Sequence, residues 1–207
     1  EQTRHRIITC SRQVFSRAGV TNTSLEEIAH EAGVTRGAVY WHFRNKADLF
    51  RAVRADTGTL LRLGPPGSGD ALRRLETTLL EAVRRLRGDA AARQTYEVML
   101  WKCEYVDELA PVRTELMKAG EAFAGELREL YAQAAAEGLT ERGLDPRLAA
   151  LETLCLYAGM VKLWLADMGG ELLRSQIEAM IRQHVASRRR REPALTPPPA
   201  SPRKKAK

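Results

Sequence analysis

Residues 33–43, GVTRGAVYWHF, concentrate side chains that can bind a polyanion on one short helix. With Val39 and Phe43 assigned to a core, Arg36, Gly37 and Tyr40 are expected on the exposed part of the helix. An arginine near a helix N-terminus can reach guanine edges, and a tyrosine can donate a hydrogen bond to a phosphate oxygen. This face therefore predicts contact with double-stranded DNA. The candidate DNA-binding residues are Thr35, Arg36, Gly37, Tyr40, Trp41, His42 and Lys46.

Individual members of this set also have plainer interpretations. Trp41 is about as well explained as a cover for a small three-helix core, and Lys46 as a solvated neighbour of a helix cap. His42 alone would be unremarkable. Gly37 fits the DNA interpretation because it removes a side chain where the backbone must come close. The spacing of the whole set, rather than any one member, favours DNA binding.

The two helices before this segment have clear ends in the sequence. Thr3 is expected to cap the first, whose apolar residues recur at three- and four-residue spacing up to Gly19. The second is expected to begin at a capping box of Thr23 and Glu26 and to end at Gly33. Two short helices joined by EAGVT are typical of a helix-turn-helix.

Further capping and breaking signals divide the rest of the chain. Thr35 is expected to cap the third helix, and Asn45 a fourth that runs towards Leu61. The stretch GPPGSG at 64–69 then breaks the helical pattern. Five longer helices are predicted beyond it, over about 70–87, 91–106, 111–136, 146–168 and 171–188.

Strand signals are nearly absent, so the expected fold class is all-α, with about nine helices. A helix-turn-helix domain is expected over residues 1–50 and a larger helical ligand-binding and dimerisation domain over 51–188. Residues 189–207, dominated by proline, arginine and lysine, are expected to form a disordered basic tail.

The net charge of +7 is concentrated at the two ends. Residues 1–54 carry nine Lys/Arg against five Asp/Glu, and residues 188–207 carry eight against one, whereas the middle is net acidic. Basic ends indicate a polyanion partner. For the tail, plain solvation is the better explanation than attraction to nucleic acid.

Three cysteines, Cys10, Cys103 and Cys155, form no CxxC pair, which indicates a reducing compartment and therefore the cytoplasm. Cys103 is better explained as a small buried hydrophobe than as an oxidation sensor. No signal-peptide pattern opens the chain, and no stretch is expected to span a membrane.

The segment TSLEEIAHEAGVTRGAVYWHFRNKADLF resembles the DNA-binding domain of the TetR family of bacterial transcriptional repressors. The resemblance implies that Thr35, Arg36, Gly37 and Tyr40 approach bases and backbone, while His42 and Lys46 hold phosphates. It also implies an all-helical homodimer that leaves its operator DNA when a small molecule binds the larger domain.

A second segment, WKCEYVDELAPV at 101–112, is similar to the AcrR/TtgR branch of this family, which regulates multidrug efflux pumps. The similarity implies a cavity for apolar or aromatic inducers among the C-terminal helices. Branch members carry asparagine or aspartate where this chain has Tyr96 and Ala158, so a more apolar pocket is expected. Ordinary core packing would need the same residues. The candidate ligand-binding residues are Leu79, Tyr96, Leu100, Phe123, Leu127, Leu154 and Ala158.

From Ala149 to Ala166 apolar residues surround the expected helix, with Glu152 and Lys162 as its charged residues. Such a helix must be covered on every side, and a second subunit is the natural cover for the side that its own domain leaves open. The alternative is a deeply buried helix in a monomer. The candidate dimer-interface residues are Leu151, Cys155, Gly159, Ile177 and Ile181.

An enzyme is not expected. The histidines at positions 5, 30, 42 and 184 have no metal-ligand spacing, no local motif joins a nucleophile to a base, and no cofactor is indicated. The leading interpretation is a ligand-released repressor of an efflux operon. A regulator of an unrelated metabolic or redox-responsive operon and a helical carrier or interaction protein remain as alternatives.

Overall fold

The computed structural model describes residues 1–59, 63, 69–166 and 170–190. The described part is all-helical apart from one isolated β-bridge between Thr140 and Arg189, in agreement with the expected fold class. Its helices are α1 (Gln2–Ala18), α2 (Leu25–Glu31), α3 (Arg36–His42), α4 (Lys46–Thr57), α5 (Ala71–Gly88), α6 (Ala90–Trp101), the short 3-10 helix η1 (Asp107–Leu109), α7 (Ala110–Ala136), α8 (Pro146–Leu165) and α9 (Gly170–Arg188).

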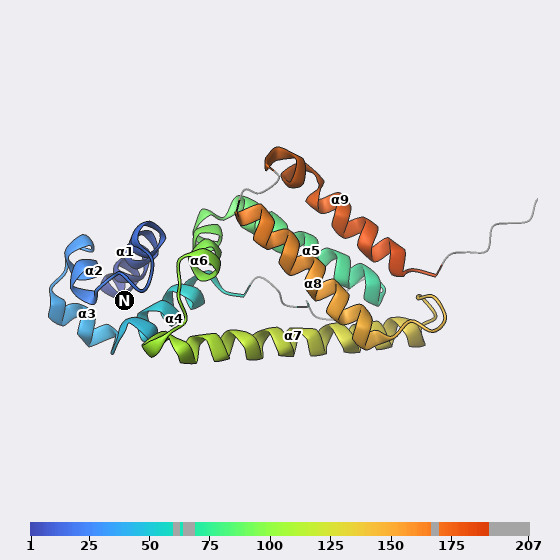
Figure 1. Cartoon of the computed structure of the whole chain (residues 1–207), viewed down its shortest axis with the longest axis horizontal. Helices are drawn as coiled ribbons and strands as arrows, with labels where there is room; N and C mark the ends of the chain where they lie inside the picture. Colours follow the sequence, from blue (N-terminus) through green and yellow to red (C-terminus); the bar gives the residue numbers. More distant parts are fainter. Residues whose placement is uncertain (60–62, 64–68, 167–169, 191–207) are drawn as a thin grey trace, which may run out of the picture.

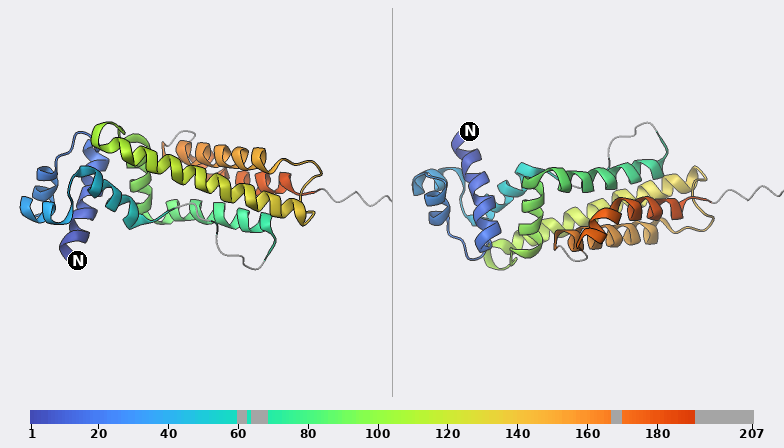
Figure 2. Two further views of the ribbon diagram at one scale, coloured as in Figure 1. Left: turned by 90° about the horizontal axis from the view of Figure 1, so that it is seen from below. Right: turned by 90° about the horizontal axis from the view of Figure 1, so that it is seen from above.

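The molecule is elongated (Figures 1 and 2). Helices α1–α3 form one end, and α5, α7, α8 and α9 form a bundle that extends away from it. Helices α4 and α6 lie between the two parts, and α7 runs from α4 to the far end of the bundle. The fold therefore places the α3 surface and the bundle at opposite ends of one long body.

The helix-turn-helix forms where the sequence predicted it, with two corrections at the caps. Helix α1 begins at Gln2 without a side-chain cap, so Thr3 lies inside it. Helix α2 is capped by Ser24, whose hydroxyl accepts a hydrogen bond from the Glu27 N–H at 3.1 Å. Thr23 instead is buried and donates to the Gly19 carbonyl at 2.7 Å. Ser24 rather than Thr23 caps α2, because the Thr23 hydroxyl is bonded to the carbonyl of Gly19, the residue that follows α1.

The expected caps of the next two helices are confirmed. The Thr35 hydroxyl accepts from the Ala38 N–H at 3.2 Å, and the Asn45 side chain accepts from the Asp48 N–H at 2.8 Å. Gly33 has a φ of +60°, the left-handed conformation that the turn between α2 and α3 requires. These local bonds determine where the short surface helix α3 and the following α4 begin.

Two helices end earlier than predicted. Helix α4 ends at Thr57, followed by Gly58 at a φ of +64°, while Leu61 lies outside the described residues. Helix α6 ends at Trp101 rather than near residue 106. The chain leaves the helix there because the Lys102 carbonyl accepts a hydrogen bond from the Val20 N–H at 2.7 Å. The segment after α6 is thus bonded to the helix-turn-helix.

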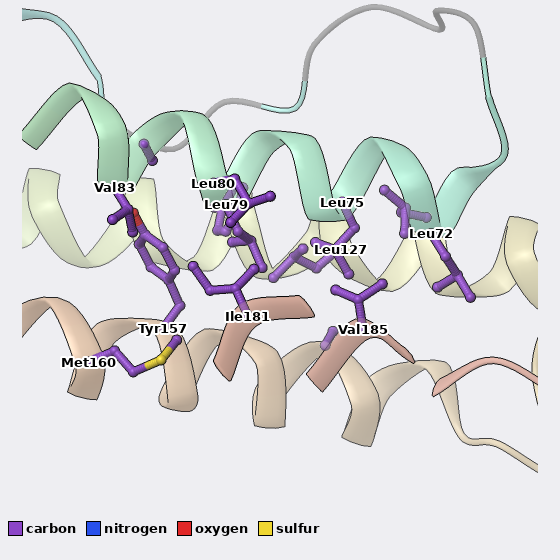
Figure 3. Close-up of a cluster of buried hydrophobic side chains, with 14 of the residues drawn as sticks. Leu72, Leu75, Leu79, Leu80, Val83, Leu127, Tyr157, Met160, Ile181 and Val185 are labelled. Carbon is purple, nitrogen blue, oxygen red and sulfur yellow. The ribbon is translucent and has the colours of Figure 1, made fainter. Parts of the chain in front are cut away.

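The bundle encloses a core built from the apolar faces of four helices, of which α5 is the richest in leucine (Figure 3). Leu72, Leu75 and Leu79 of α5 point towards Leu127 of α7 and Ile181 of α9. Each of these side chains is almost fully buried within a single chain. The core is therefore complete without a second subunit.

A second core lies under the helix-turn-helix and is not confined to it. Besides the apolar residues of α1–α4, it contains Val98 of α6, Leu109 of η1 and Val112 of α7. Helix α4 runs continuously across residue 50, the expected domain limit. The two parts of the molecule share buried side chains rather than meeting at a flexible joint.

Polar contacts reinforce this junction. The buried Arg12 guanidinium on α1 donates to the Thr95 hydroxyl on α6 at 3.1 Å and also pairs with the carboxylate of Asp56 on α4. Glu115 on α7 pairs with Arg51 at 2.8 Å and with Arg54 at 3.7 Å, both on α4. Helices α6 and α7 are thereby bonded to the DNA-binding half.

Helix α8 differs from the expectation that no stretch of the chain could span a membrane. It is long and apolar enough to cross a membrane, with a mean hydropathy of 1.4 in its most apolar window, of which 39% is buried. In the fold, however, α8 packs beside α7 and α9, and its Glu152 pairs with Arg188 at 2.6 Å. The test rests on length and composition alone, so one such helix is weak evidence for a membrane span.

The last described residues are held in place. The Arg189 guanidinium forms two hydrogen bonds of 2.8 and 2.9 Å with the Asp70 carboxylate, and the Arg190 N–H donates to the Leu139 carbonyl at 2.7 Å. The expected tail boundary at residue 189 is therefore two residues too early. The rest of the tail, 191–207, lies outside the described residues.

Candidate DNA-binding surface and ligand cavity

Helix α3 presents an open surface because its two apolar anchors are both turned inward. Val39 and Phe43 are buried in the core shared with α1, while Thr35 and Gly37 are exposed. A Cβ atom built on Gly37 would meet only the Thr35 hydroxyl, at 3.9 Å, among the described residues. The backbone of the first turn is therefore accessible to a large, flat partner.

Arg36, Tyr40 and Glu26 form one polar group on this surface. Glu26 of α2 pairs with the Arg36 guanidinium at 2.9 Å and accepts a hydrogen bond from the Tyr40 hydroxyl at 3.3 Å. The same guanidinium lies 5.3 Å from the centre of the Tyr40 ring, within the range of a cation–π contact. Glu26, which orients Arg36 and Tyr40, was not among the predicted site residues, because no local sequence pattern indicates a contact between side chains ten or more positions apart.

Trp41 is the most exposed large hydrophobic residue of the described chain, with 86% of its surface open. It does not cover the three-helix core, so that interpretation is wrong. His42 is half-buried, and its ring lies 6.2 Å from that of Phe43. Trp41 therefore projects where a partner can contact it, whereas His42 stands closer to the core.

Lys46 is neither freely solvated nor fully available. Its ammonium donates to the carbonyls of Thr21 and Thr23, at 2.8 and 3.0 Å. An ammonium has three N–H donors, so one remains for another acceptor. Lys46 bonds the loop before α2 to the start of α4 and keeps one donor beside the α3 surface.

An apolar cavity of about 250 Å³ lies between α6, α7 and α8. Five of the seven candidate ligand residues line it, namely Tyr96, Leu100, Phe123, Leu154 and Ala158. The lining residues that the sequence analysis did not name are Thr59, Met99, Leu116, Ala119, Gly120, Tyr157 and Val161. Those in helices were missed because each also fits an ordinary helix–helix contact, and Thr59 because it lies in the segment that follows α4.

The other two candidates, Leu79 and Leu127, are placed elsewhere. Both lie in the interior of the bundle, within the core between α5 and α7 (Figure 3). A larger hollow of about 620 Å³, no more open to solvent than the first, has the charged residues Arg87, Arg93 and Glu97 in its lining beside Trp164 and Leu165. Because its wall is more polar than the predicted inducers require, the smaller cavity is the better candidate.

Tyr157 differs from the other polar groups of the cavity wall. Its hydroxyl is buried and has no hydrogen-bond partner among the described residues. Burial, with a smaller contribution from neighbouring Tyr96, raises the pKa of the Tyr157 hydroxyl well above its ordinary value. The group is therefore neutral and can act as a hydrogen-bond donor at physiological pH.

The candidate dimer residues divide into two groups. Leu151, at 53% exposure, and Cys155 lie on the outer side of α8, and a Cβ on the half-buried Gly159 would meet nothing within 4 Å among the described residues. Ile177 and Ile181 of α9 point into the core of their own chain, so their prediction as interface residues is wrong. Leu148 and Leu163 extend the exposed apolar side of α8.

Cys103 does not have the properties of an oxidation sensor. It is half-buried, and desolvation raises the pKa of its thiol to about 11, so the reactive thiolate is scarce at neutral pH. Within the part of the chain that the structure describes, no cluster of His, Cys, Asp and Glu could hold a metal ion.

The family comparisons agree with this arrangement. Residues 7–53 match the family of bacterial regulatory proteins named for tetR, and residues 70–187 match the C-terminal region of the MAATS-type transcriptional repressors. The HTH-type transcriptional regulator TtgR of Pseudomonas putida (strain DOT-T1E) is 32% identical over 170 residues, covering 80% of this chain and 81% of TtgR.

Solved structures of repressors have the same fold. NalD of Pseudomonas aeruginosa, the secondary repressor of the MexAB-OprM multidrug efflux pump, has 33% identity and a TM-score of 0.78, covering 92% of this chain and 97% of NalD. SmeT of Stenotrophomonas maltophilia, in a complex with triclosan, has 26% identity and a TM-score of 0.74, covering 96% and 99%. Members of this family are DNA-binding regulators rather than enzymes, as the sequence predicted. The chain belongs to the TetR family of transcriptional repressors.

Proposed function

We propose that this repressor is a cytoplasmic homodimer that controls a multidrug efflux operon and leaves its operator when a neutral apolar or aromatic compound binds. The observation that carries the proposal is the apolar cavity between α6, α7 and α8. It occurs in a chain whose helix α3 is exposed for DNA. The similarity to NalD and SmeT, both repressors of multidrug efflux pumps, supports an efflux operon over an unrelated metabolic one.

DNA recognition is assigned to the exposed face of α3. Glu26 orients Arg36 and Tyr40 through its ion pair and hydrogen bond with them, and the neighbouring Trp41 is exposed to solvent. When α3 enters a major groove, the Arg36 guanidinium can exchange its carboxylate partner for base edges or phosphates. Lys46 uses two of its three N–H donors within the protein, and we assign the third to a phosphate contact.

Dimerisation is assigned to the outer side of α8. Leu148, Leu151 and Leu163 are large apolar residues exposed on one helix, a pattern typical of a surface that another subunit covers. Gly159 leaves room for a partner helix to approach closely. A twofold pair would present two copies of α3 to two operator half-sites.

Ligand release is assigned to the helices that both line the cavity and contact the DNA-binding half. On α6, Tyr96 lines the cavity and the preceding Thr95 bonds to Arg12 of α1. On α7, Leu116 lines the cavity and the preceding Glu115 pairs with Arg51 of α4. A ligand that separates α6 from α7 therefore acts directly on the helices that position α3.

The DNA assignment is tested by the salt dependence of binding to a fragment from the regulator's own upstream region. Each phosphate that a cation neutralises contributes about 0.9 to the slope of log affinity against log salt, so Tyr40→Phe with Lys46→Ala should weaken binding and lower the slope by about 1, all of it from the lysine. Arg128→Ala, which removes an exposed charge from α7, is the control and should leave the slope unchanged. An unaltered slope in the double variant refutes these contacts.

A further inference from the structure

The Tyr157 hydroxyl is the unusual group in the wall of the cavity. Only 3% of this residue is exposed, and its oxygen has no hydrogen-bond partner among the described residues. Figure 3 shows the ring reaching from α8 towards Val83 of α5, with its oxygen among aliphatic side chains. Leaving a buried hydroxyl unpaired is costly, because water is lost and nothing replaces it.

Two other tyrosines of the described chain, the buried Tyr131 and the half-buried Tyr105, do not carry this cost. The Tyr131 hydroxyl, equally buried, lies 2.7 Å from the Thr153 hydroxyl. The Tyr105 hydroxyl donates to the Met99 carbonyl at 2.8 Å. Tyr157 is thus distinguished from tyrosines that stabilise the fold, and a role in stability alone does not explain its hydroxyl.

The position of the ring connects this hydroxyl to the cavity. Tyr157 lines the cavity together with Leu154, Ala158 and Val161 on the same helix. The Tyr157 hydroxyl also lies within electrostatic range of Tyr96, which lines the same cavity. A ligand oxygen at this end of the cavity would therefore supply the partner that the hydroxyl lacks.

The rest of the wall limits the class of ligand. Among the described residues, the lining contains no charged side chain, and its polar members are Thr59, Tyr96 and Tyr157. A charged ligand would lose its hydration without gaining a counter-charge, so the wall favours a neutral one. A hydroxyl can donate and accept one hydrogen bond at the same time, which suits a phenol or a ketone.

We propose that Tyr157 determines the specificity of the cavity by forming a hydrogen bond with a neutral, mainly aromatic ligand that carries a single hydroxyl or carbonyl oxygen. The inference rests on the proposed function and narrows its ligand class. It assigns affinity to the aromatic body of the ligand and discrimination to one polar contact.

The test uses thymol and p-cymene, which share the same ring and alkyl groups and differ only by the thymol hydroxyl. Calorimetric titration of the full-length protein should show thymol binding about tenfold more tightly, the ratio that one good hydrogen bond supplies. In Tyr157→Phe the ratio should fall to about one, with p-cymene binding unchanged. The control Tyr131→Phe removes a hydroxyl outside the cavity and should keep the ratio.

A second measurement is thermal unfolding without ligand. Tyr157→Phe should melt at the same temperature as the parent protein or higher, since it removes an unpaired polar group, whereas Tyr131→Phe should melt lower. A tenfold ratio that persists in Tyr157→Phe, or failure of the parent protein to bind either compound, overturns the assignment of Tyr157. Operator binding measured on the same samples separates the two proposals, because a protein that binds no operator refutes the proposed function instead.

Discussion

The bond between Arg12 and Thr95 provides a quantitative test of how firmly the two parts of the molecule are joined. Arg12 is 5% exposed, and Thr95 is fully enclosed beside it on α6. Replacing Thr95 with valine keeps the shape of the side chain but removes the acceptor for the guanidinium N–H. A hydrogen bond to a buried charged group contributes about 1.5–3 kcal/mol, so Thr95→Val should lose about 2 kcal/mol of unfolding free energy. For a chain of this size the melting temperature should fall by roughly 4–8 °C.

A double-mutant cycle with Arg12→Met isolates this bond from the side effects of each substitution. Urea unfolding of the parent protein, both single variants and the double variant should give a coupling energy of about 2 kcal/mol. All four are compared at one protein concentration, because unfolding of an associating protein depends on it. A coupling below about 0.5 kcal/mol would mean that the contact does not link α1 to α6 energetically.

Three other predictions concern caps, acid stability and association. Asn45→Ala should lower the unfolding free energy by about 1 kcal/mol in urea titrations, because it removes the cap of α4, and Asn45→Asp should retain most of it. The Arg189 hydrogen bonds lower the pKa of Asp70, so the stability from this pair is complete above the ordinary aspartate pKa of about 3.9 and is lost as pH falls through the lowered value. The gap in urea midpoint between the parent protein and Asp70→Ala should accordingly narrow at pH 3, and a gap that widens there contradicts the pairing. Leu151→Glu should shift the protein to monomer in light scattering, whereas Met117→Glu, which changes a similarly exposed residue on α7, should leave it associated.

The helix-turn-helix could be predicted closely because its signals are local. Thr35 and Asn45 cap their helices through bonds to residues three positions away, and Gly33 marks its own turn. The error at the start of α2 has the same local scale. Two neighbouring hydroxyl residues both suit the cap position, and the contact of Thr23 with Gly19 decides between them.

The bundle was harder to predict because an apolar residue on a helix can face the core, a ligand cavity or a partner subunit. Leu79 and Leu127 have the spacing of cavity residues, but they face the core, and Ile177 and Ile181 do the same on α9. Helical periodicity tells which residues share a face, but the identity of the neighbouring helix decides whether that face meets a core, a cavity or a partner. Glu26 was missed for a related reason, since its partners come from another helix.

The apolar core shared by α1–α4 with Val98, Leu109 and Val112 has a practical consequence for finding inducers. With hydrophobic side chains common to both halves, neither half is expected to melt without the other, and calorimetry should record a single endotherm. Any compound that occupies the cavity of the native chain would then raise that one transition, by an amount set by its concentration relative to its dissociation constant. Compound libraries can therefore be ranked by dye-based melting of the purified repressor before any operator sequence is known.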